Sequence, residues 1–81
     1  MGPPEAGGFP KVSGIQWEFK EGRTVVEAWH APEAGRNRAG KRYLGRFGKR
    51  RTEELLGLPF DSRLHEIRSQ LESWRRGKGI E

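Results

Sequence analysis

The 81-residue chain contains no cysteine, which excludes disulfide frameworks and thiolate metal sites. It also lacks a long apolar run, since no segment approaches the roughly 20 residues that a membrane-spanning helix needs. The N-terminus has neither the charged nor the apolar region of a secretory signal. These absences predict a soluble protein, or a soluble part of a larger one, and are compatible with a reducing compartment.

Residue patterns that would indicate an enzyme are also missing. The two histidines, His30 and His65, have no cysteine partner and no metal-binding spacing, and no glycine-rich phosphate loop follows a predicted strand. A chain of this length has little room for a water-excluding substrate cavity. We therefore expect no catalysis, no metal, no cofactor and no small-molecule substrate.

What the sequence does have is a concentrated positive charge. The segment 35–51, "GRNRAGKRYLGRFGKRR", holds eight Lys or Arg residues and no acid, whereas the rest of the chain has eight basic and 11 acidic residues, a net charge of −3. Tyr43, Leu44 and Phe47 lie within this basic segment. Such local charge is typical of proteins that bind polyanions.

Apolar residues alternate with polar ones before and within the basic segment, which predicts three strands. Ile15, Trp17 and Phe19 define the first run, and Gly22 suits a turn with a positive φ. The second run covers 24–31 and stops before Pro32, which cannot donate to a ladder. After a connection over 32–40, the third run covers 41–47, and an antiparallel meander is the simplest arrangement.

The apolar period changes to that of a helix over 61–76. Leu64, Ile67, Leu71 and Trp74 are spaced by three, four and three residues, and so share one helical stripe. The pattern predicts a cap at Asp61 or Ser62 and an end at Gly77, whereas 52–57 suggests a short helical turn capped by Thr52.

Packing the helical stripe on one face of the sheet buries both elements, so we predict an α+β fold with a three-stranded antiparallel sheet packed on one C-terminal α-helix. We expect residues 11–77 to form this single domain, 1–10 to be a disordered lead-in and 78–81 to be a frayed tail. The sheet residues expected to meet the helix are Ile15, Trp17, Phe19, Val26, Ala28, Leu44 and Phe47. The opposite face is expected to hold Gln16, Glu18, Lys20, Glu27, Trp29, Lys41 and Tyr43.

Three stretches, "SGIQW" at 13–17, "GR" followed by "VEA" at 22–28, and "GKRYLGRF" at 40–47, resemble the ethylene-response-factor (Apetala-type) DNA-binding domain of plants and its apicomplexan relatives. The resemblance implies a transcription factor domain whose sheet enters the major groove. A similar sheet-plus-helix arrangement occurs in the arm-binding N-terminal domain of tyrosine-recombinase integrases, and the long link from strand to helix fits that alternative.

Both resemblances imply that a monomeric isolated domain binds double-stranded DNA, in the nucleus of a eukaryote or otherwise in the cytoplasm. By position, the residues expected to contact bases are Gln16, Glu18, Glu27, Trp29, Lys41 and Tyr43, since amide, acid and amine groups match base edges in the major groove. Those expected to contact phosphates are Lys20, Arg23, Arg36, Arg38, Arg46, Lys49, Arg50 and Arg51.

Other interpretations of the same residues stay open. Glu18 and Glu27 can be cross-strand partners of Lys or Arg on a solvated face, and Trp29 can be a packing residue. Exposed Trp29 and Tyr43 can instead stack unpaired bases of RNA or a single strand. The helical stripe can also face a partner helix, although it lasts under two heptads.

Overall fold

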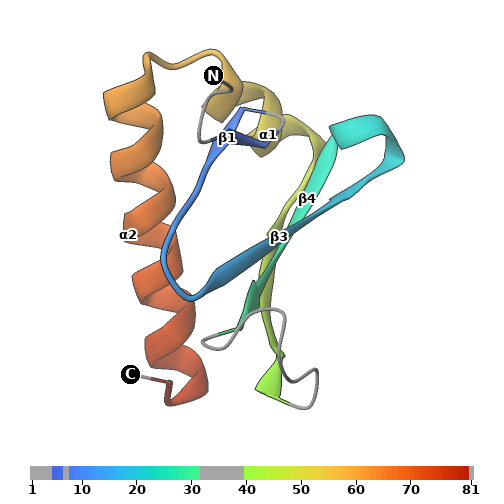
Figure 1. Cartoon of the computed structure of the whole chain (residues 1–81). Helices are drawn as coiled ribbons and strands as arrows, with labels where there is room; N and C mark the ends of the chain where they lie inside the picture. Colours follow the sequence, from blue (N-terminus) through green and yellow to red (C-terminus); the bar gives the residue numbers. More distant parts are fainter. Residues whose placement is uncertain (1–4, 7, 32–39, 81) are drawn as a thin grey trace.

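The computed structural model describes residues 5–6, 8–31 and 40–80 (Figure 1). Two short strands come first, followed by a three-stranded sheet and two helices. In chain order the elements are β1 (Glu5–Ala6), β2 (Phe9–Pro10), β3 (Ile15–Lys20), the 3₁₀ turn η1 (Glu21–Arg23), β4 (Val25–His30), β5 (Arg42–Phe47), α1 (Lys49–Leu56) and α2 (Phe60–Lys78).

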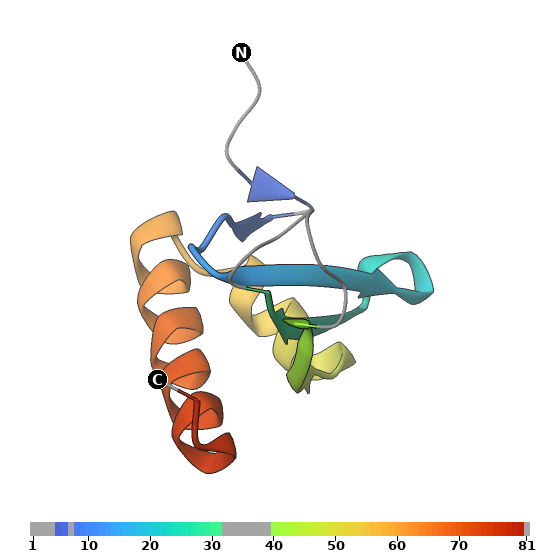
Figure 2. The ribbon, with the colours of Figure 1, turned by 60° about the horizontal axis from the view of Figure 1, so that its bottom comes forward.

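Strands β3, β4 and β5 form an antiparallel meander with β4 in the centre, and α2 packs along one side of it. This confirms the predicted α+β fold with its C-terminal helix. The η1 turn between β3 and β4 lies at the end of the sheet away from α2, as both views show (Figures 1 and 2). Gly22 has a φ of 65° there, as the sequence predicts, and the flanking Glu21 and Arg23 also have positive φ.

The predicted core is largely confirmed. Val26, Ala28, Leu44 and Phe47 are buried against Ile67 and Leu71 of α2. The partly buried side chains that pack around this cluster include Ile15, Trp17, Phe19 and Trp74.

The β4–β5 ladder contains a register shift between Ala28 and Trp29. Ala28 pairs with Gly45 and Trp29 pairs with Tyr43, so Leu44 is an extra residue on β5. A bulge of this kind lets two successive residues of one strand oppose a single partner residue. Consequently Leu44 is buried, while Tyr43 lies beside Trp29 on the other face.

Both ends of the folded region extend further than predicted. Phe9 is fully buried and packs with the rings of Trp17, Phe19 and Phe47, so the prediction of a disordered lead-in is wrong at β2. Trp17 Nε1 also donates to the carbonyl of Pro10 at 2.8 Å. The prediction is also wrong at Glu5–Ala6, which pair with β2 as strand β1. The rest of it falls mainly on 1–4 and 7, outside the described residues.

At the C-terminus, α2 continues through Gly77 and ends at Lys78, and Gly79 is the left-handed capping residue. Ile80 N donates to the carbonyl of Arg75 at 2.9 Å, and the Ile80 side chain is buried. The prediction of a frayed tail is therefore wrong for 78–80. A glycine two residues later supplies the positive φ that the end of the helix needs.

Two other helix predictions are also wrong. The residue that precedes α2 is Pro59, and no side chain caps this end, so neither Asp61 nor Ser62 has the predicted role. Helix α1 begins at Lys49 rather than after Thr52. Thr52 is buried within α1, and its hydroxyl donates to the carbonyl of Phe47 at 3.1 Å, which fastens the helix to the end of β5.

Candidate nucleic-acid interface

The sheet face opposite α2 carries eight polar or aromatic side chains, which we call the open face. Strand register places them in rows that cross the three strands. The members of the open face are Gln16, Glu18, Lys20, Glu27, Trp29, Lys41, Tyr43 and Arg46.

Two rows cross all three strands. One row consists of Gln16, Trp29 and Tyr43. The next row consists of Glu18, Glu27 and Arg46. Alternate residues of a strand are about 6.8 Å apart, so the two rows present two separate sets of hydrogen-bonding groups.

Trp29 is the half-buried centre of the open face. Its Nε1 donates to Glu18 Oε1 at 3.0 Å, and its ring meets the Tyr43 ring edge-on, with centroids 5.2 Å apart. The ammonium group of Lys41 lies 4.8 Å from the centroid of the Trp29 ring. These contacts restrain Trp29 on three sides and hold Lys41 above the sheet.

The two acids of the open face differ in their contacts. Glu18 accepts from Trp29 and lies 4.0 Å from the Lys20 ammonium group. Glu27 is directly opposite Glu18 on β4 and opposite Arg46 on β5, yet the described residues give it no ion pair. The register would allow Glu27 to pair with Arg46, but this ion pair does not form among the described residues. The Glu27 carboxylate is therefore available to accept a hydrogen bond.

Cationic residues lie at both ends of the open face. At the η1 side, the cations next to the strand ends are Lys20 and Arg23, together with Lys49 and Arg50 in the first turn of α1. Lys41 immediately precedes β5 at the opposite end. Arg36 and Arg38, which were predicted to contact phosphates, lie outside the described residues.

Arg51 differs from the other predicted phosphate contacts. Its guanidinium group pairs with Glu54 at 3.2 Å and with Glu66 of α2 at 3.1 Å. The pair with Glu66 joins α1 to α2, whereas the pair with Glu54 lies within α1. Arg23 is also engaged, because its guanidinium carbon lies 5.8 Å from the Phe19 ring centroid.

Lys78 is a residue of this region that sequence patterns did not indicate. Its ammonium group lies 5.8 Å from the Tyr43 ring centroid, so the last turn of α2 brings a cation to the edge of the sheet. The sequence separates these two residues widely, and only the tertiary packing brings them together.

His30 lies on the α2 side of the sheet, where it pairs with Ile15 and Arg42. Burial lowers the pKa of His30, and the nearby guanidinium groups of Arg75 and Arg42 lower it further. Its Nδ1 and the Nε of Arg75 are buried and have no hydrogen-bond partner among the described residues.

Metal and membrane sites receive no support from the described parts of the chain. There, His, Asp and Glu side chains do not gather in a group of three or more that would hold a metal ion. None of the helices in residues 40–80 has the length and apolar character needed to cross a bilayer.

Comparisons of the chain with protein-family models, curated proteins and solved structures gave no match. The functional assignment therefore depends on the geometry and chemistry of the open face.

Proposed function

We propose that this chain binds double-stranded DNA with a sequence preference, by inserting its open face into the major groove. The observation that carries the proposal is the register of the three strands, which aligns amide, acid, amine and guanidinium groups on one face with cations at both ends. A three-stranded sheet spans about 10 Å between its outer strands, which is compatible with a major groove about 12 Å wide.

The side chains of the open face match the chemistry of base edges. Gln16 can donate to and accept from adenine, Arg46 and Lys41 can donate to the acceptors of guanine, and Glu27 can accept from cytosine. In this proposal Glu18 and Trp29 act mainly as positioning residues, because each is engaged by the other. Tyr43 and Trp29 offer ring edges to thymine methyl groups or to sugars.

Phosphate contacts would come mainly from the η1 end of the sheet. Lys20, Lys49 and Arg50 are exposed, so their charges can reach one DNA backbone at little cost. Contacts of this kind set affinity and orientation without reading the sequence.

The geometry of Trp29 favours a duplex over a single strand. A stacking platform needs a free ring face, whereas Lys41 occupies one side of Trp29 and Tyr43 lies against its edge. This supports groove contacts rather than the stacking of unpaired bases. The cellular role that the resemblance implies is the DNA-binding domain of a nuclear transcription factor, and an integrase arm-binding domain would use the same face.

The test is fluorescence anisotropy of the protein with a labelled random-sequence duplex and with a single strand of equal length, each over a salt series. We expect tighter binding to the duplex and a steep loss of affinity with salt. A duplex-binding result justifies selecting the preferred site from a random library. Tighter binding to the single strand would contradict the proposal and favour RNA or single-stranded DNA as the ligand.

A further inference from the structure

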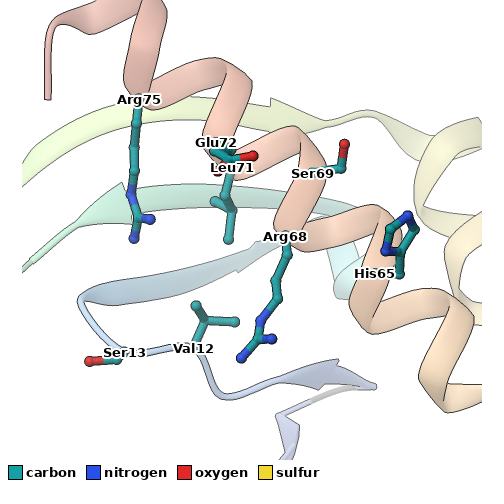
Figure 3. Close-up of a pocket in the computed structure, with 8 residues that line it drawn as sticks. All are labelled: Val12, Ser13, His65, Arg68, Ser69, Leu71, Glu72 and Arg75. Carbon is teal, nitrogen blue, oxygen red and sulfur yellow. The ribbon is translucent and has the colours of Figure 1, made fainter. Parts of the chain in front are cut away.

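A second charged surface lies on the α2 side of the molecule, away from the open face. A groove of about 490 Å³ separates α2 from the segment that leads into β3, with Val12 and Ser13 forming one wall (Figure 3). The other wall is a single face of α2, made of His65, Arg68, Ser69, Leu71, Glu72 and Arg75.

Two arginines reach across this groove. Arg68 and Arg75 extend from α2 toward the segment with Val12 and Ser13, and Leu71 lies between them (Figure 3). A Cβ atom on Gly14 would lie 4.0 Å from Arg75 Nη2, so the Arg75 guanidinium group reaches the far wall.

The charge of these arginines is not compensated by the described residues. Glu72 is one helical turn from each of them, yet neither forms an ion pair or a side-chain hydrogen bond with it. The Nε atom of Arg75 is buried without a hydrogen-bond partner. His30 Nδ1 is buried without a partner among the described residues as well, so the part of Arg75 that a ligand can reach is the end of its guanidinium group.

We propose that this groove binds an extended acidic peptide segment of a partner protein, with an apolar side chain between two carboxylates. Val12 supplies apolar contact in the middle, since Leu71 is only 1% exposed, and the arginines on either side can each bind a carboxylate in bidentate fashion. The Cα atoms of Arg68 and Arg75 are separated by about 10 Å along the helix axis. In an extended peptide, residues i and i+4 point to one side about 13 Å apart with i+2 between them, which flexible arginine side chains can match.

An acidic peptide suits this groove better than a nucleic acid backbone. Phosphates would use the two guanidinium groups but gain nothing from apolar contact with Val12. The groove also lies on the α2 side of the sheet, so a bound peptide and DNA on the open face would not compete for the same surface.

The test is a titration of the isotopically labelled protein, followed by amide chemical shifts, with the blocked pentapeptide Asp-Gly-Leu-Gly-Asp. We expect saturable shifts at Val12, Ser13 and Arg68, and smaller or no shifts with Asn-Gly-Leu-Gly-Asn. Arg68→Gln, on the exposed side of α2, should weaken binding by about fivefold or more because a charge-assisted hydrogen bond is lost. Arg75→Gln should do the same, whereas Arg76→Gln, an equal change of charge on the next residue, should leave the affinity unchanged.

Several results would overturn the proposal. One is an absence of saturable shifts in the groove, and another is equal weakening by Arg68→Gln and Arg76→Gln, which would indicate unspecific attraction to a basic protein. Inorganic phosphate is titrated in parallel. If it shifts the same amides with an affinity equal to that of the acidic pentapeptide, the groove is a simple anion site. Repeating the titration with duplex DNA present should leave the peptide affinity unchanged, and competition by DNA would contradict separate surfaces.

Discussion

At Gly45 the backbone of β5 lies directly against the indole ring of Trp74. A Cβ atom at this position would overlap the ring, because the nearest atoms are Trp74 Cε2 and its neighbours. The absence of a side chain at residue 45 is therefore what allows α2 to approach the sheet.

Gly45→Ala should lower the free energy of unfolding by about 1–3 kcal/mol, since it overpacks the contact between sheet and helix. The matched control is Gly77→Ala, where a Cβ atom meets nothing within 4 Å and the residue lies inside α2. This control should raise stability by about 0.5–1 kcal/mol because alanine favours helix more than glycine does. Urea unfolding measures both, and equal effects of the two substitutions would contradict the close approach.

His30 should make stability depend on pH. Its folded-state pKa lies below the ordinary value of about 6.5, because of burial and of the charges of Arg75 and Arg42. The unfolded chain therefore takes up a proton more readily, so stability is fully present above about pH 6.5 and is lost as the pH falls below it.

We expect the free energy of unfolding to fall between pH 7.5 and pH 5.5, and His30→Gln to flatten that fall. His65→Gln changes an exposed histidine of α2 and serves as the control. If the His65 substitution flattened the profile and the His30 substitution did not, the assignment to His30 would be wrong. Unfolding curves at a series of pH values provide the measurement.

Among the elements, the sequence predicted the three strands and α2, because alternation and a helical stripe are both strong signals. Helix α1 was predicted only as a short turn, since three successive cations at 49–51 are typical of a solvated loop. Tertiary contacts compensate one of these charges, as Arg51 pairs with Glu66 of α2. The burial of Phe9 was likewise not predictable from the sequence. An isolated aromatic residue among glycines and prolines belongs to no repeating apolar pattern, and its burial depends on the rings of Trp17, Phe19 and Phe47.

Arg63 shows how side chains can join elements that sequence patterns do not relate. Its guanidinium group ties the N-terminal segment to the junction between α1 and α2. It donates to the carbonyl oxygens of Gly8 at 2.8 Å, Leu58 at 2.9 Å and Leu55 at 3.1 Å.

Arg63→Lys should lower the free energy of unfolding by about 1–3 kcal/mol, because one ammonium group cannot replace the fork of donors that reaches several carbonyl groups. Arg76→Lys, on the exposed surface of the same helix, should change stability by less than about 0.5 kcal/mol. Thermal and urea unfolding provide the comparison. A similar small effect at both positions would show that the Arg63 hydrogen bonds contribute little.

At the scale of the whole molecule, the sequence predicted which residues share the open face but not which cations remain available. Alternation is enough to place Gln16 and Trp29 on one side. The involvement of Arg51 in ion pairs with Glu54 and Glu66 follows from how α1 sits on α2, which a linear pattern cannot reveal. Of the basic residues at 49–51, we therefore expect Lys49 and Arg50 to contribute to DNA affinity.

Lys49→Gln should weaken binding to all duplexes alike and reduce the slope of log affinity against log salt by about one unit. Arg51→Gln should leave that slope nearly unchanged, although both variants lose one positive charge. Gln16→Ala and Lys41→Ala should instead relax the preference at individual base pairs. Anisotropy titrations on selected and mismatched duplexes distinguish loss of a phosphate contact from loss of a base contact. Identical behaviour of all four variants would refute the division into phosphate-contacting and base-contacting residues.

The extra residue at Leu44 shifts the inward and outward alternation of β5 by one position. Leu44 and Phe47 are three positions apart, so strict alternation would send one of them outward, whereas the bulge lets both reach the core. Every residue of β5 before the bulge therefore faces the opposite side of the sheet from the one that regular alternation, counted back from Phe47, would give it. If the same sequence paired without the bulge, regular alternation counted back from Phe47 would turn Tyr43 and Lys41 toward α2, and the molecule would keep its composition and charge while losing two of the eight side chains of the open face. Deletion of Leu44, in contrast, should leave Tyr43 opposite Trp29 and remove only a core side chain.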